Sequence, residues 1–79
     1  MTQEEEIGLL TDKYDRHRMA RRLREARAGR YLEDVARSCG ISQSALEMYE
    51  TGRRIPRDHI KIRLAKYYGK TVQEIFFDN

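Results

Sequence analysis

LEDVARSCGISQSALEMYETG, residues 32–52, is the stretch of this 79-residue chain that decides its fold. Its apolar residues recur at helical spacing in two short runs, Val35, Ala36 and Cys39 in the first and Leu46 and Tyr49 in the second. Gly40 stands directly after the first run, where a residue in the left-handed conformation ends a helix without a Cβ clash. The stretch therefore predicts two short helices separated by a turn.

The turn has a second signal on its far side. Ser42 precedes Gln43, and a serine hydroxyl at that position accepts from the free N–H groups that open a helix. Two short helices joined by a three- or four-residue turn containing glycine form a helix-turn-helix. The second helix of such a motif suits the major groove of DNA.

Position by position, this stretch resembles the DNA-binding motif of the phage repressor and Cro-like family, also called XRE-type. The matching positions are Ala36, Gly40, Ile41, Leu46 and the ending Tyr49-Glu50-Thr51-Gly52. The resemblance covers roughly residues 19–77, because Leu64-Ala65-Lys66-Tyr67-Tyr68-Gly69 and Glu74-Ile75-Phe76 match the closing helices of the family. It implies an all-α, lambda-repressor-like domain of five helices.

The remaining helices are expected on either side of the motif. Residues 12–28 predict a long helix with Asp12 or Asp15 as its cap and with Met19, Leu23 and Ala26 on one face. Residues 58–68 predict a fourth helix capped by Asp58, and residues 71–77 a fifth, opened by a Thr71–Glu74 capping box. Residues 1–11 are expected to be an arm or a short extra helix, so that residues 12–79 form the domain.

Charge is unevenly distributed along the chain. From Arg16 onward fifteen Lys or Arg residues stand against eight Asp or Glu, a net charge of +7, whereas the amino end is acidic. A basic domain favours a polyanionic partner, although a charged, solvated helical surface explains the composition equally well. The helix-turn-helix decides in favour of nucleic acid.

Other classes of protein find no support in the sequence. His17 and His59 lie far apart, the single Cys39 is expected in the core, and no glycine-rich phosphate loop or cysteine pair is present. No apolar run approaches the roughly 20 residues of a membrane span. We therefore expect a cytoplasmic, bacterial or phage-encoded protein that is not an enzyme and has no cofactor, metal, membrane or small-molecule ligand.

Base reading is expected at the exposed start and outer face of the second motif helix. The candidates are Ser42, Gln43, Ser44, Glu47 and Met48. Gln43 is the strongest, because its amide can pair bidentately with adenine. Met48 offers an apolar contact with a thymine methyl group, and Glu47 either accepts from cytosine or repels phosphate.

Phosphate contacts are expected from the basic loop that follows the motif, at Arg53, Arg54 and Arg57. The family often has Thr-Gln where Tyr31-Leu32 stand here, so neither role transfers, and Arg30 is the candidate for that phosphate contact while Leu32 packs inward.

The resemblance also implies an ion pair between an arginine of the first helix and Glu50. Counting back from Ala36 places Glu25 at the usual distance, whereas a loop one residue longer places Arg24 there.

A homodimer on a near-palindromic operator is expected, since one helix reads too few base pairs to stand out among genomic sites. Self-association candidates are Ile55 and Pro56 in the basic loop and the aromatic residues Tyr67 and Phe77. The function expected is that of a transcriptional regulator, a repressor, that binds double-stranded DNA in a sequence-specific way. The alternative is an antitoxin-like module that uses the same domain to hold a protein partner.

Overall fold

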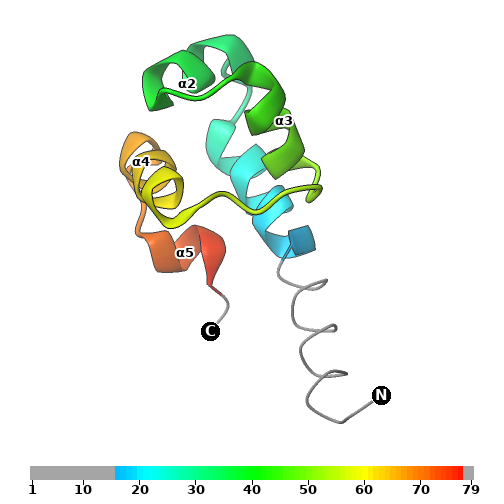
Figure 1. Cartoon of the computed structure of the whole chain (residues 1–79). Coiled ribbons are helices and arrows are strands. Elements are labelled where there is room, and N and C mark those ends of the chain that lie inside the picture. The colour runs from blue at the N-terminus through cyan, green and yellow to red at the C-terminus, as the bar shows by residue number, and fades with distance from the viewer. Residues whose placement is uncertain (1–15, 78–79) are drawn as a thin grey trace, which may run out of the picture.

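The computed structural model describes residues 16–77, and this part of the chain contains five helices and no strand (Figure 1). A helix over residues 16–27 is followed by α2 (Leu32–Cys39), α3 (Gln43–Glu50), α4 (Asp58–Tyr68) and α5 (Val72–Phe76). The expected all-α, five-helix architecture is confirmed. The predicted arm over residues 1–11 and the predicted caps Asp12 and Asp15 lie outside the described residues.

The core draws on every helix. The five largest fully buried side chains come one from each helix in chain order, Leu23, Val35, Leu46, Leu64 and Ile75. Full burial of such a side chain stabilises the fold by roughly 1.5–3 kcal/mol, so each helix is held mainly by its apolar face. Cys39 is also buried, as expected, and burial raises the pKa of its thiol, which keeps the thiol protonated.

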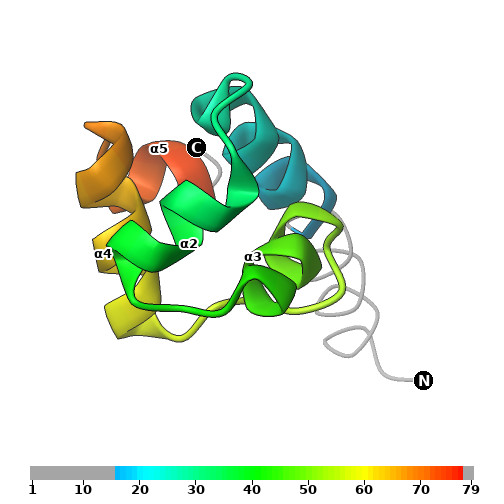
Figure 2. The same cartoon turned by 90° about the horizontal axis from the view of Figure 1, so that it is seen from above.

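α2 and α3 form the expected helix-turn-helix. Gly40 ends α2 with a left-handed φ of 69°, and the Ile41 N–H then reaches back to the Ala36 carbonyl at 3.0 Å. Ser42 opens α3, its Oγ accepting from the Ala45 N–H at 3.0 Å. Seen from above, α2 and α3 lie on either side of this turn (Figure 2).

The start of α4 differs from the expectation. Asp58 was expected to cap the helix, but the extended cap position falls on Arg57, whose ψ is 161°, and no side chain caps α4. Asp58 is already the first helical residue, so its carboxylate does not occupy the cap position. It lies 3.7 Å from the Lys61 ammonium instead, and a carboxylate in the first turn still interacts favourably with the helix dipole.

The start of α5 agrees with the expectation. The Glu74 N–H donates to Thr71 Oγ1 and the Thr71 N–H donates to Glu74 Oε1, both at 3.1 Å, which completes the capping box. The hydrogen bond from the Thr71 N–H, then the Thr71 side chain, with a smaller effect of Lys70, hold the pKa of the Glu74 carboxyl below its ordinary value.

Candidate nucleic-acid interface

α3 is divided into a buried side and an exposed polar side. Leu46, Tyr49 and Glu50 are buried, whereas four of the five expected base-reading residues, Ser42, Gln43, Ser44 and Glu47, are exposed. Met48 is half-buried, so less of its side chain is available than the helical count alone implies. Within residues 16–77 the Gln43 amide has no hydrogen-bond partner, which leaves its donors and acceptor available to a base edge.

The carboxyl end of α3 is fixed by a buried charge. Glu50 is only 4% exposed, and its carboxylate accepts two parallel hydrogen bonds from Arg27, Nε to Oε2 at 2.8 Å and Nη2 to Oε1 at 3.0 Å. The hydrogen bond to Glu50 raises the pKa of Arg27, and this effect outweighs partial desolvation, which lowers the pKa. A buried carboxylate is tolerated only with such a partner, so this contact sets how α3 sits on the helix of residues 16–27.

Arg24 was predicted as the partner of the Glu50 carboxylate, and this prediction is therefore wrong. Arg24 does reach the same residue, but its Nη1 donates to the backbone carbonyl oxygen of Glu50 and not to the carboxylate. Arg27 lies one helical turn later on the same face, and after it Ala28 and Gly29 both take positive φ values of 51° and 83°. The spacing of the sequence alone did not reveal which of the two arginines meets the carboxylate.

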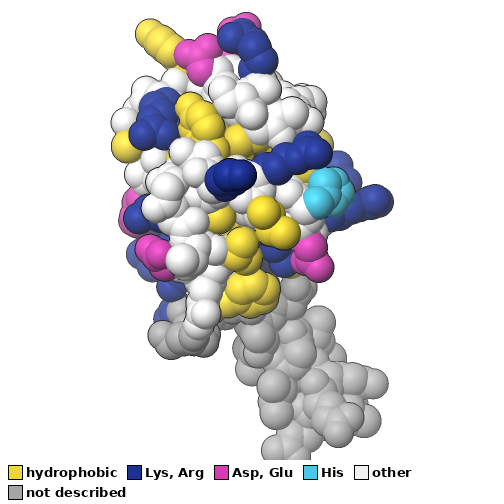
Figure 3. Space-filling view, turned by 90° about the vertical axis from the view of Figure 1, so that its left-hand side faces the viewer, with side chains coloured by type: hydrophobic (Ala, Val, Ile, Leu, Met, Phe, Trp, Pro, Cys, Tyr) yellow, Lys and Arg dark blue, Asp and Glu magenta, His cyan; other side chains and the backbone are white. Residues whose placement is uncertain are grey.

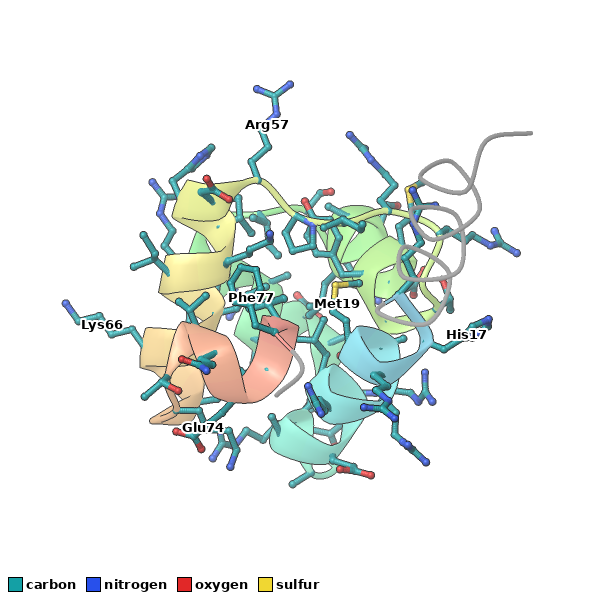
Figure 4. All side chains as sticks on the ribbon, turned by 90° about the horizontal axis from the view of Figure 1, so that it is seen from below. His17, Met19, Arg57, Lys66, Glu74 and Phe77 are labelled. Carbon is teal, nitrogen blue, oxygen red and sulfur yellow. The ribbon has the colours of Figure 1, made fainter. Side chains whose placement is uncertain are left out.

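The loop after α3 carries the expected phosphate-binding arginines on its surface. Arg53, Arg54 and Arg57 are all exposed, and Arg57 points away from the body of the molecule (Figure 4). The loop begins folded against α3, because the Arg53 N–H donates to the Met48 carbonyl oxygen at 2.9 Å. Exposed guanidinium groups on a fixed backbone beside α3 can contact the phosphates that flank a groove.

Arg30 lies near the start of α3 but is also engaged elsewhere. It lines a surface hollow together with Gln43 and Tyr31. Tyr31 is 78% exposed and was not predicted as part of the interface. The Arg30 guanidinium lies 5.5 Å from the ring centroid of Tyr67 and 6.0 Å from that of Tyr68. Leu32 packs inward against the core, as expected.

The expected self-association residues are only partly available. Ile55, Tyr67 and Phe77 are exposed at 39%, 36% and 52%, and for the two aromatic residues this agrees with the helical count. Pro56 is buried, so its expected place on a dimer surface is wrong. The Lys61 ammonium lies 5.2 Å from the ring of Phe77. On the face that carries α4, hydrophobic side chains are interspersed with basic ones (Figure 3).

Other kinds of site are not formed by the part of the chain that the structure describes. No group of three or more His, Cys, Asp or Glu side chains in residues 16–77 is arranged to hold a metal ion. No helix in the same range has the length and apolar character needed to cross a membrane. The features that stand out are the exposed polar side of α3 and the arginines around it.

Comparison with known proteins gives one match. A family model described as a helix-turn-helix domain, of the XRE/Cro-like type, matches residues 18–75. This range contains α2, α3 and α4 in full and most of the helix of residues 16–27. No curated protein and no solved structure matches the chain.

Proposed function

This chain belongs to the helix-turn-helix domain family of the XRE/Cro-like type, and from that premise we propose that it is a transcriptional repressor that binds a specific sequence of double-stranded DNA. Members of the family typically bind DNA and are not enzymes. The proposal goes further than family membership, because it assigns sequence selectivity, a repressor role and particular residues.

One observation carries the proposal: the exposed polar side of α3 is held rigidly at both ends. Ser42 caps the amino end, and the Arg27–Glu50 ion pair fixes the carboxyl end to the helix of residues 16–27. Base readout needs side chains presented at a fixed angle to the groove. Gln43 stands at the amino end of α3, so we assign it the main base contact.

The arginines beside α3 supply the second part of the proposal. Arg53, Arg54 and Arg57 contact phosphates on one side of the groove, and Arg30, next to Gln43, contacts them on the other. Phosphate contacts position the domain and raise its affinity without reading sequence.

The working form that we propose is a homodimer on a near-palindromic operator. One α3 of eight residues reads only a few base pairs, whereas two copies about 34 Å apart double the readout. We assign the contact to Tyr67, Phe77 and Ile55, three of the exposed apolar side chains; Ile62 and Tyr31 are exposed as well. Because a cation lies over the ring of Tyr67 and another over that of Phe77, we expect the dimer to be weak in solution and to be completed on DNA.

Selection from a pool of random duplexes, followed by sequencing of the bound fraction, tests the proposal. We expect enrichment of one near-palindromic sequence and, in sedimentation experiments, two chains per selected duplex at saturation. One chain per duplex with an asymmetric sequence would overturn the dimer and leave a monomeric reader. Absence of enrichment over nonspecific binding would overturn the DNA-reading role and favour the module that holds a protein partner.

The repressor role has a separate test. We expect the selected sequence, placed over a promoter, to reduce transcription of a reporter when the chain is supplied. Unchanged or increased reporter transcription, with the duplex still bound in vitro, would contradict repression without contradicting DNA binding.

A further inference from the structure

The helix of residues 16–27 carries a basic stripe on its outer side. Among the described residues, His17, Arg18, Arg21 and Arg24 line one surface hollow, and none of residues 16–77 that line it is acidic. His17, Arg21 and Arg24 stand at i, i+4 and i+7, so they form a row along the helix. His17 points outward, on the side of the molecule opposite to Lys66 (Figure 4).

This concentration of charge is unfavourable for the helix by itself. Like charges three or four positions apart repel and destabilise a helix. The effect is visible at Arg18, whose pKa is lowered by desolvation and then by the charges of Arg22 and Arg21. Arg21 is exposed and forms no hydrogen bond or ion pair within residues 16–77, and Glu25 borders a different hollow together with Arg22. A polyanion along the stripe would relieve the repulsion.

The stripe is continuous with the arginine loop that follows α3. A Cβ added at Gly52, whose φ is +75°, would lie 3.2 Å from the backbone carbonyl oxygen of Arg16, so the turn after α3 is pressed against the start of the first helix. At the other end of the stripe, Arg24 donates to the backbone of Glu50. Seen from above, α3 lies alongside the start of this helix (Figure 2).

We propose that the stripe of His17, Arg18, Arg21 and Arg24 is a second phosphate-contacting surface, which holds the same DNA duplex beyond the segment read by α3. The inference rests on the proposed function and extends it to the flanks of the operator. A DNA strand that leaves the Arg53–Arg54 loop meets the stripe next, because Gly52 and Arg16 join the two surfaces. An acidic protein would also fit the charge. The stripe adjoins the loop that we propose binds DNA phosphates, however, and this favours DNA as the partner.

The dimensions agree with a DNA backbone. His17 to Arg24 spans about 10 Å along the helix axis at 1.5 Å per residue. A strand of duplex carries one phosphate per 3.4 Å of its axis, so the stripe faces about three phosphates. The surface therefore suits a short run of one strand, with no base contact and no sequence preference.

Two duplexes carrying the same selected sequence test the inference. One is trimmed to the base pairs of the selected site, and the other has about 10 base pairs, one helical turn, added at each end. We expect the wild-type chain to bind the long duplex several-fold more tightly, with a steeper salt dependence. Arg21→Gln is expected to remove most of this difference, to lower the salt slope on the long duplex by about 1, and to leave the short duplex bound as before.

Two control variants separate the stripe from a general effect of charge. Lys66→Gln removes an exposed positive charge from the opposite side of the molecule and is expected to leave the preference for the long duplex intact. Arg21→Lys keeps the charge and is expected to retain most of that preference. Thermal unfolding of each variant establishes that it is folded.

Three results would overturn the inference. Equal affinity of the wild-type chain for both duplexes would show that the stripe meets no flanking DNA. Equal weakening of Arg21→Gln on both would place Arg21 inside the core site. After either of these results, selective binding of the short duplex would still support the proposed function. Absence of selective binding to both duplexes would overturn the proposed function and this inference together.

Discussion

The guanidinium of Arg27 holds both carboxylate oxygens of Glu50, at 2.8 and 3.0 Å, where the helix of residues 16–27 meets the carboxyl end of α3. Arg27 also donates through Nη1 to the Arg30 carbonyl oxygen at 2.7 Å, so one side chain joins α3, the first helix and the loop before α2. Among the polar contacts that we describe, those of Arg27 therefore contribute most to the orientation of α3.

Replacing Arg27 tests this dependence. Arg27→Ala leaves the Glu50 carboxylate buried without its partner, and we expect a loss of about 2–4 kcal/mol in the free energy of unfolding, since Arg27 itself is 22% exposed. Arg24→Ala removes only a hydrogen bond to a backbone oxygen and is expected to cost about 1 kcal/mol. Urea denaturation measures both.

A double variant provides the control for that comparison. In Arg27→Ala with Glu50→Gln the buried group is neutral, so we expect part of the lost stability to return. If Arg24→Ala lowers the free energy of unfolding more than Arg27→Ala does, then Arg24 is the main partner of the carboxylate, as the family resemblance implied.

The hydroxyl of Tyr68 is the second unusual polar group of the core. Its oxygen is buried and has no hydrogen-bond partner among the described residues. Burial, then the nearby Glu50 carboxylate, raises the pKa of Tyr68, so the hydroxyl stays protonated. We expect Tyr68→Phe to be neutral or to stabilise the fold by up to about 1 kcal/mol, because it removes an unsatisfied group.

Tyr67→Phe is the matched control for that substitution, because Tyr67 is 36% exposed and adjacent in the chain. Thermal unfolding of the two variants is expected to show no change for Tyr67→Phe. A loss of 1 kcal/mol or more for Tyr68→Phe alone would mean that an ordered water or another group satisfies its hydroxyl.

Gly40 is required by the geometry of the turn between α2 and α3. At its φ of 69° an alanine carries the left-handed penalty of about 1–2 kcal/mol. Gly69 ends α4 with nearly the same φ of 68° and open space where a Cβ would lie, so Gly69→Ala measures the backbone penalty alone. At Gly40 the Cβ would meet only the end of the Arg63 side chain, at 3.2 Å, which can move.

We therefore expect Gly40→Ala and Gly69→Ala to lose similar amounts of stability in urea denaturation. Only Gly40→Ala is expected to weaken DNA binding, because it lies in the motif. A much larger loss for Gly40→Ala would mean that Arg63 is held in place by its hydrogen bond to the Cys39 carbonyl oxygen.

The sequence predicted the core well, for a physical reason. Leu23, Val35, Leu46 and Leu64 occupy apolar positions at helical spacing, and burying such positions decides how amphipathic helices pack. Ser42, Gly40 and the Thr71–Glu74 box were also predicted correctly. These signals are local, so the structure of the rest of the chain cannot alter them much.

The errors concern contacts that depend on the path of a loop. Arg24 and Arg27 lie one turn apart on one face of the helix and both reach Glu50, so helical spacing cannot tell which of them meets the carboxylate. Pro56 was placed on the surface, as most prolines are, but in the folded chain it is buried. Tyr31 was not proposed for the interface, and its exposure follows from its place before α2 and not from any spacing.

The capping box of α5 predicts a dependence of stability on pH. The hydrogen bonds from Thr71 lower the pKa of Glu74, so its stabilising effect is fully present above the ordinary glutamate value of 4.5. The effect is lost as the pH falls below that value, through the lower pKa of the folded state. Glu74→Gln keeps an acceptor without the titration, so we expect its stability to fall less steeply over this range.

Acid denaturation followed by circular dichroism measures that difference. Thr71→Val removes the side-chain acceptor of the box and is expected to bring the pKa of Glu74 closer to its ordinary value. Parallel pH profiles for the wild-type chain and Glu74→Gln would contradict the assignment of the titration to Glu74.

The last prediction separates base reading from phosphate binding at the proposed interface. Gln43→Ala removes the amide that can pair with adenine, so we expect a loss of about 1–3 kcal/mol of discrimination at one position of the half-site. Arg53→Ala with Arg54→Ala removes two exposed charges and is expected to weaken all sequences alike, lowering the salt slope by about 2. Binding of a library of single-base variants of the selected duplex at several salt concentrations measures both effects. Because Gln43 has no partner among the described residues, its replacement is expected to leave the free energy of unfolding within about 0.5 kcal/mol of the wild-type value. An unchanged base preference in Gln43→Ala, or a preference changed at a single position in the arginine variant, would show that the two roles are assigned to the wrong residues.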